Sequence, residues 1–228
     1  MAANKNVFVE KPLATNEEEL SKIVKYFNGE FSPLLFVGFN RRFSSAIQKI
    51  KEELRNRVGP LYMIYRVNAL YAPLNSWVHE DGGRIIGEVC HFIDVLLFLA
   101  GSKITSIQKN MISPHPNVKY LDYDNIVISI SFEDGSLGII HYVSMGNKAL
   151  SKEYLEIHYD DKSIVLDNFK ELHGFGTSFN KLTFSQDEKG LLEELKVLHK
   201  ALKEGGKFPI SLDDMIAVTK ATFEIMKR

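Results

Sequence analysis

Cysteine is nearly absent from this chain: Cys90 is the only one among 228 residues. A single cysteine excludes an internal disulfide and is typical of a reducing compartment, so we expect a cytoplasmic location. No group of cysteine and histidine residues has the spacing of a zinc site, and we therefore predict no metal.

The chain also lacks an excess of charge of one sign and has no long apolar run. The 28 basic residues nearly balance the 29 acidic ones, which gives a formal net charge of -1. Such a chain has no overall field to attract nucleic acid. The longest apolar stretches, such as residues 95–100, are much shorter than the roughly 20 residues of a membrane-spanning helix. We therefore expect neither a nucleic-acid partner nor a membrane partner.

The first forty residues are typical of a strand–helix–strand unit. Residues 6–9 form a short apolar stretch that Pro12 ends, and the acidic residues 17–19 favour the start of a helix. Residues 34–39 are almost continuously apolar, which is the pattern of a strand buried on both faces. We therefore predict that residues 1–40 are the last βαβ-like remnant of a Rossmann domain.

From residue 41 onward the pattern changes to paired strands with separate helices. Turn sequences at 133–135 and 160–161 lie between apolar runs, as they do in hairpins. We predict an α+β fold over residues 41–228, in which helices pack on one face of an open, mostly antiparallel sheet. The expected strands are 61–70, 104–111, 125–132, 136–144, 154–159 and 162–167, and the expected helices are 44–57, 84–99, 188–204 and 211–227.

Glu10, Lys11 and Pro12 stand at the carboxyl end of the first predicted strand, which is the edge at which open α/β sheets bind ligands. Proline restricts the backbone here and so directs the lysine side chain. An ammonium group in this place can hydrogen-bond a substrate hydroxyl and stabilise a developing alkoxide. A strand-end turn with solvated charges explains the same three residues.

The segment 82–94 places Glu88, His91 and Asp94 three residues apart along an otherwise apolar helix. Glu88 could orient and polarise the imidazole of His91, which makes His91 a candidate general base. Gly87, inside the helix, favours close approach of a ligand. The alternative is a buried histidine that Asp94 or a backbone group satisfies.

Other polar residues are candidates for substrate binding. Residues 40–42 directly follow the second buried strand and include two arginines, which can hold a phosphate or carboxylate, although solvated charges fit equally well. Aromatic faces stack on sugar rings and polar side chains bond their hydroxyls, which suits residues 65–68 and 77–79, although the tryptophan could equally fill the core. The candidate substrate-binding residues are thus Asn40, Arg41, Arg66, Asn68, Trp77 and Asp94.

Four stretches match one known family in the right order. They are Val7-Phe8-Val9-Glu10-Lys11-Pro12-Leu13-Ala14, Val37-Gly38-Phe39-Asn40-Arg41-Arg42-Phe43, the histidine helix at 82–94, and Ser211-Leu212-Asp213-Asp214. With them the chain resembles, over essentially its whole length, the glucose–fructose oxidoreductase/inositol dehydrogenase (Gfo/Idh/MocA) family. The Glu-Lys-Pro element and the histidine helix, about 80 residues apart, are specific as a pair. Residues 83–94 are most similar to a branch in which this module follows a zinc-type alcohol dehydrogenase module.

The resemblance implies a Rossmann domain that binds NAD or NADP, followed by a domain that binds a small carbohydrate-type substrate. It implies hydride transfer at a hydroxyl or carbonyl carbon of a sugar, nucleotide-sugar or cyclitol. It also implies that subunits associate through the sheet face, as a homodimer or homotetramer.

By the same resemblance, Lys11, with Glu10 and Pro12 beside it, would contact the nicotinamide ribose and the substrate, and His91 would be the acid/base. Many members carry aspartate four residues before that histidine. Here the position is Gly87, and the adjacent Glu88 is the candidate replacement.

The family's Gly-x-Gly-x-x-Gly turn, which binds the cofactor's pyrophosphate, occurs nowhere in the sequence. We therefore expect a truncated or degenerate product that binds NAD or NADP poorly and is inactive alone. Two other functions fit the residues. A non-catalytic sugar-binding or subunit-assembly domain would use the exposed sheet face, and an aldolase- or isomerase-like enzyme would use Lys11 as a Schiff-base amine.

Overall fold

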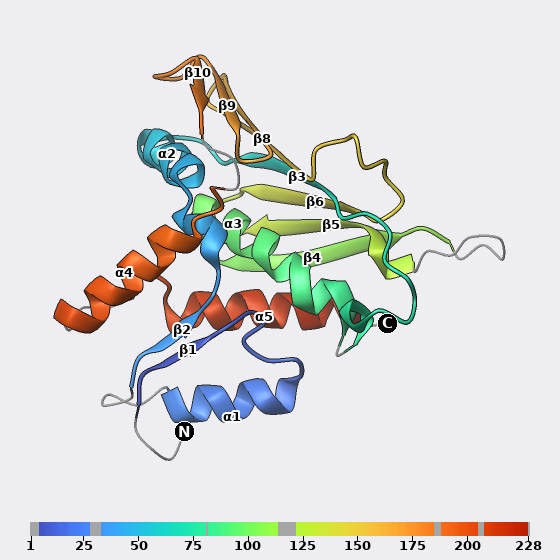
Figure 1. The fold of residues 1–228 in the computed structure, drawn as a ribbon. Coiled ribbons are helices and arrows are strands. Elements are labelled where there is room, and N and C mark those ends of the chain that lie inside the picture. The colour runs from blue at the N-terminus through green and yellow to red at the C-terminus, as the bar shows by residue number, and fades with distance from the viewer. Residues whose placement is uncertain are drawn as a thin grey trace.

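The computed structural model describes residues 5–27, 33–80, 82–113, 122–184, 188–204 and 208–227. They form a large sheet of eight strands with helices on one side, and a small parallel sheet with its own helix (Figure 1). The predicted α+β class and the mostly antiparallel sheet are confirmed. In the described ranges, no helix is both long and apolar enough to cross a lipid bilayer.

The smaller unit is the predicted βαβ element: β1 (Val7–Val9), α1 (Glu17–Phe27) and β2 (Leu35–Val37). β1 and β2 pair in parallel. Three glutamates in the first turn of α1 lie at the positive end of the helix dipole. α1 contacts α5 (Leu212–Met226), so the unit lies on the far side of α5 from the large sheet (Figure 1).

The large sheet has the strand order β10-β9-β8-β7-β3-β6-β5-β4. β3 and β6 pair in parallel, and the other neighbouring strands are antiparallel. The strands are β3 (Tyr62–Asn68), β4 (Ile104–Met111), β5 (Asn125–Phe132), β6 (Leu137–Val143), β7 (Glu153–Tyr159), β8 (Lys162–Asp167), β9 (Glu171–Phe175) and β10 (Lys181–Thr183).

All six predicted strands are present, with ends that shift by up to two residues. β9 and β10 were not predicted, because Gly174 interrupts the first and the second has only three residues, one of them apolar. The alternation predicted for β5 is confirmed: Ile128 and Ile130 are fully buried, whereas Val127 is 41% exposed. One face of the sheet therefore carries the core, and the other is open.

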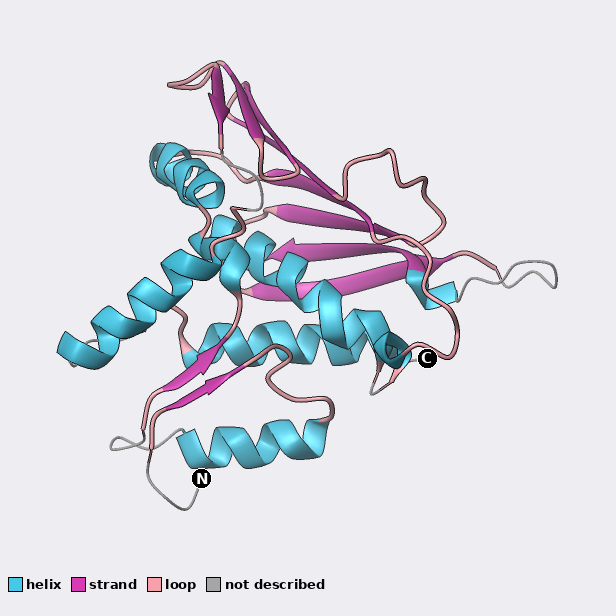
Figure 2. Cartoon of the chain, viewed as in Figure 1, coloured by secondary structure: helices cyan, strands magenta, loops and turns pink. Residues whose placement is uncertain are grey.

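The helices α3 (Cys90–Ala100) and α5 cover the core-facing side of the sheet (Figure 2). α2 (Ser45–Glu53) is shorter than predicted and continues only as a 3₁₀ turn at Leu54–Asn56. α4 (Leu191–Glu204) begins three residues late, because Gly190 precedes it with a φ of +83°. A Cβ at Gly190 would lie 2.3 Å from the carbonyl oxygen of Asn40, so only glycine allows this close approach.

The predicted helix 84–99 differs most from the structure. It begins with a π-helical turn, Ile85–Val89, and becomes α-helical only at Cys90. π-turns are rare and occur frequently at functional sites. This turn therefore makes the segment a candidate for a functional site, although its apolar side chains Ile85 and Val89 are buried in the core.

Arg42 links three elements inside the core. It lies in a 3₁₀ turn, Asn40–Phe43, that directly follows β2. Its guanidinium donates two hydrogen bonds to Asp94 of α3, one of them at 3.0 Å, and lies 3.4 Å from a carboxylate oxygen of Asp214 at the start of α5. Arg42 and Asp94 are almost fully buried, so each charge depends on the other for compensation.

We expect Arg42→Met to lower the free energy of unfolding by about 3–5 kcal/mol, because it leaves the Asp94 carboxylate buried without its partner. Urea unfolding measures this directly. The control is Lys22→Gln, which breaks an ion pair whose two side chains are mostly exposed and should have little effect. Equal losses in the two variants would contradict the role given to Arg42.

Candidate active site

A cavity of about 560 Å³ lies where the end of β1 meets the π-turn and a 3₁₀ turn, Trp77–His79. Six of the predicted site residues line it: Lys11, Pro12, Arg41, Trp77, Glu88 and His91. Five do not: Glu10, Asn40, Arg66, Asn68 and Asp94. The fold therefore brings the two motifs that carried the sequence argument, the Glu-Lys-Pro element and the histidine helix, to one place.

Lys11 joins these two motifs directly. Its ammonium nitrogen donates a hydrogen bond of 2.6 Å to the carbonyl oxygen of Gly87, 76 residues away in the sequence. A Cβ built on Gly87 would meet no atom within 4 Å, so this glycine faces open space. An ammonium group has three donors, so Lys11 keeps two for a ligand in the cavity.

His91 lines the cavity but is itself 6% exposed. Burial lowers the pKa of its imidazole well below the usual value, and the positive charges of Arg41 and Lys11 act in the same direction. Its Nδ1 atom has no hydrogen-bond partner among the residues that the structure describes. The arrangement therefore holds a neutral imidazole that can accept a proton.

Glu88 does not bond His91, which corrects the pair predicted from the sequence. Its carboxylate accepts hydrogen bonds from the hydroxyl of Tyr142 and, at 2.6 Å, from the ammonium of Lys152. Burial alone would raise the pKa of Glu88, but Lys152 and Tyr142 outweigh it and keep the group ionised. Glu88 is thus a fixed negative charge in the cavity wall.

Asp94 is also not part of the cavity, and it does not satisfy His91. Its carboxylate is fully buried and bonded to Arg42. Glu88 lies in the π-turn and lines the cavity, whereas Asp94 lies in α3 and is fully buried. Of the three polar residues predicted along one side of this helix, Glu88 and His91 line the cavity, and Asp94 lies in the core.

Arg41 has a different partner from its neighbour Arg42. Its guanidinium makes two hydrogen bonds of 2.9 Å to Glu153, which also accepts from Tyr65 at 2.8 Å and from Lys189 at 2.6 Å. Burial alone would raise the pKa of Glu153, but Arg41 and Lys189 hold it far below its usual range. Arg41 is therefore a fixed positive charge at the cavity, shared with one buried carboxylate.

The other predicted binding residues make contacts within the protein. Arg66 donates to the carbonyl oxygen of Ser151 at 2.7 Å, and Asn68 to that of Asn147 at 2.8 Å. Asn40 donates to a backbone carbonyl before α4, at Lys189. Trp77 lies at the cavity rim and is 77% exposed, so it is not part of the core.

Three charged residues that line the cavity were not predicted: Glu80, Arg84 and Lys152. Lys152 is an isolated lysine in a loop, with no pattern to mark it. Glu153, the partner of Arg41, was also missed. Glu153 did carry a signal, because it occupies a core-facing position at the start of β7, two residues before Leu155. A charge at such a position indicates a buried ion pair.

No group of three or more histidine, cysteine, aspartate or glutamate side chains in the part of the chain described could hold a metal ion. The one cysteine, Cys90, is buried and free.

Comparison with known proteins gives relatives that are dehydrogenases. The chain is 24% identical over 224 residues to a myo-inositol 2-dehydrogenase of Thermotoga maritima, a match that covers 93% of this chain and 66% of that protein. It is 36% identical over 107 residues to an inositol 2-dehydrogenase of Saccharopolyspora erythraea, covering 46% of the chain and 30% of the relative. No family model matches the chain.

Solved structures support the fold. A levoglucosan dehydrogenase in complex with NADH and levoglucosan superposes with a TM-score of 0.77 at 20% identity, over 98% of this chain and 71% of that one. The chain spans 66% of the myo-inositol 2-dehydrogenase and 30% of the inositol 2-dehydrogenase named above, in each case less than two thirds of the relative's length.

We expect His91 to remain neutral on acidification. Its imidazole proton resonances should not move between pH 7 and about pH 5.5, where free histidine, with a pKa of about 6.5, is mostly protonated. The unfolded chain binds a proton that the folded chain does not, so the free energy of unfolding should fall as the pH drops through about 6.5. NMR titration of His91 tests this, and a midpoint at or above that of free histidine would contradict it.

Proposed function

From the resemblance to the Gfo/Idh/MocA family, which the relatives confirm, we propose that this chain supplies the substrate side of an NAD(P)-dependent dehydrogenase. The substrate would be a sugar, nucleotide-sugar or cyclitol, and the reaction would take place at one of its hydroxyl or carbonyl carbons. The single observation that carries the proposal is that the ammonium group of Lys11, bonded to the carbonyl oxygen of Gly87, and the imidazole of His91 line the same cavity.

In the direction of oxidation, His91 accepts the proton of the substrate hydroxyl, which a neutral imidazole can do and a protonated one cannot. Lys11 donates a hydrogen bond to the same oxygen and stabilises the negative charge that develops there. Its bond to the carbonyl oxygen of Gly87 holds the ammonium in place beforehand. Trp77, exposed at the rim, offers an aromatic face to the sugar ring.

The residues present fit one end of the cofactor. Lys11 keeps free donors at the cavity and Pro12 lies beside it, which suits the nicotinamide ribose. The chain has no glycine-rich turn for the pyrophosphate. When bound, NAD or NADP supplies the hydride acceptor.

We propose the domain division expected from the sequence: residues 1–40 belong to the cofactor-binding domain, and residues 41–228 bind the substrate.

We also propose that two copies associate through the open face of the large sheet, in the cytoplasm. Tyr62 is 44% exposed on this face, and the half-buried Ile64 and Ile139 lie beside it on β3 and β6. These apolar side chains are suited to an interface between copies.

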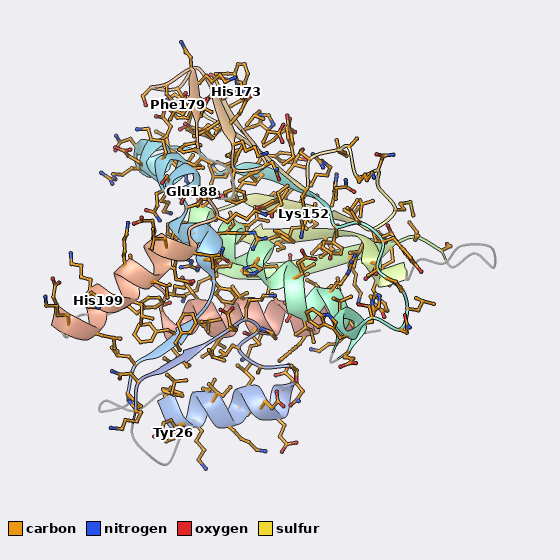
Figure 3. The ribbon with its side chains drawn as sticks, viewed as in Figure 1. Tyr26, Lys152, His173, Phe179, Glu188 and His199 are labelled. Carbon is orange, nitrogen blue, oxygen red and sulfur yellow. The ribbon has the colours of Figure 1, made fainter. Side chains whose placement is uncertain are left out.

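In the enzyme with its cofactor-binding half, Lys11→Ala and His91→Ala should each lower kcat by about 10²–10⁴-fold, because each removes a group that acts on the reacting oxygen. The assay follows reduced nicotinamide by absorbance. The control is His199→Ala, whose side chain lies on α4, away from Lys152 (Figure 3). Rates near wild type for either variant would exclude that residue from the chemistry, and sugar binding without turnover would favour a non-catalytic binding domain.

The open space at Gly87 leads to a separate prediction. Gly87→Asp should fold, because the new Cβ meets no atom, and its carboxylate should raise the pKa of His91 toward the ordinary value. Since the base must be neutral to act, the acid limb of the kcat–pH profile should move to higher pH. Gly87→Asn is the uncharged control and should leave the limb in place. If the acid limb of the kcat–pH profile moves equally in both variants, the size of the new side chain and not its charge is responsible.

A further inference from the structure

The walls of the active-site cavity carry an excess of positive charge. Among the residues that the structure describes, four cationic side chains and two carboxylates line it. The cations are Lys11, Arg41, Arg84 and Lys152, and the carboxylates are Glu80 and Glu88. In a site of low dielectric constant such an excess is unfavourable unless a ligand offsets it.

Two of these cations have no carboxylate partner within the described residues. Lys11 donates to the carbonyl oxygen of Gly87, and Arg84, itself buried, donates to that of Leu70 at 2.6 Å. Neither takes part in an ion pair there. A backbone carbonyl group carries only a dipole and no net charge, so most of the positive charge of Lys11 and of Arg84 remains uncompensated.

The carboxylates next to the other cations are shared. Arg41 and Lys189 have one buried partner between them, Glu153. Glu88 lies within electrostatic range of both Lys152 and Arg84, and both lower its pKa against the effect of burial. Burial is the main cause of the lowered pKa of His91, and Arg41, Lys11 and Lys152 act in the same direction. Among the described residues that line the cavity, cations therefore outnumber carboxylates.

We propose that the substrate of this site is an anionic sugar, whose carboxylate or phosphate is bound by Arg84 and Lys152. The inference rests on the proposed function, which assigns the reacting hydroxyl to Lys11 and His91. Arg41 is bound to Glu153, so Arg84 and the partly exposed Lys152 are the cations left for a second group. Arg84 and Lys152 both line the cavity and both act on Glu88, and Lys152, whose side chain is 43% exposed, is able to turn from Glu88 to a ligand. A cavity of about 560 Å³ has room for one sugar ring with a charged substituent.

Trp77 makes this testable in the 228-residue chain itself, because it is the only tryptophan and it lies at the rim of the cavity. Its fluorescence is titrated with D-glucuronate, D-glucose 6-phosphate, D-glucose and myo-inositol. We expect at least one of the two anions to bind about tenfold or more tightly than either neutral compound. The advantage should shrink when salt is raised from about 0.02 M to about 0.5 M, because salt screens charges. The two anions separate a carboxylate from a phosphate.

Variants locate the anion. Lys152→Gln and Arg84→Gln should each reduce the preference for the anion at least severalfold, and Arg84→Lys should retain part of it. The matched control is Lys196→Gln, which removes an exposed ammonium that pairs with Glu193 on α4 and should leave the preference unchanged. Lys152 is partly exposed, so its variant is suitable even if the Arg84 variant fails to fold.

The other possible results of the titrations separate a failure of the anionic-sugar inference from a failure of the proposed function. Equal or tighter binding of neutral sugars overturns the inference and leaves the proposed function standing. Anion binding that neither variant weakens also overturns it, because the anion then lies elsewhere. If NAD quenches Trp77 at lower concentration than any sugar and Arg84→Gln abolishes this, the cations serve the cofactor. If no sugar of either kind binds, the proposed function is overturned as well.

Discussion

Two neighbouring arginines, buried in different directions, hold the site together. Arg42 pairs with Asp94 in α3 and reaches Asp214 in α5, whereas Arg41 pairs with Glu153 in β7. Both belong to the 3₁₀ turn that directly follows β2, so they fix the small parallel unit to the helices and to the large sheet at one point. Because β1 pairs with β2, the same anchor sets where the end of β1 lies.

That position determines the chemistry of the cavity. The end of β1 places the ammonium of Lys11 on the carbonyl oxygen of Gly87, in the π-turn that leads to His91. Arg41 thus has two effects: it contributes to the anchor, and with Lys11 it adds to the burial that lowers the pKa of His91. A neutral imidazole and a fixed ammonium in one cavity suit the proposed proton transfer from an alcohol, and the surplus of cations among the described lining residues is the basis of the proposed anionic substrate.

The sequence predicted the class of fold and the six longer strands, because periodic burial is a local signal. That Lys11 and His91, 80 residues apart, line one cavity was expected from the family resemblance and not from any local pattern. The sequence did not predict the partners of the charged residues. Glu88 pairs with Lys152 and not with His91, and Asp94 pairs with Arg42. The spacing of three assumed one regular α-helix, whereas Glu88 lies in a π-turn and only His91 and Asp94 lie in α3. Lys152 could not have been found at all, because only the tertiary fold brings its loop to the cavity.

The most direct test of the account is a crystal structure of the chain with a bound sugar acid. The account predicts one substrate hydroxyl within about 3 Å of both the Lys11 ammonium and a ring nitrogen of His91, with the anionic group beside Arg84 and Lys152. A sugar bound with its hydroxyls away from both Lys11 and His91, or an imidazole closed off from it by apolar side chains, would contradict the central claim.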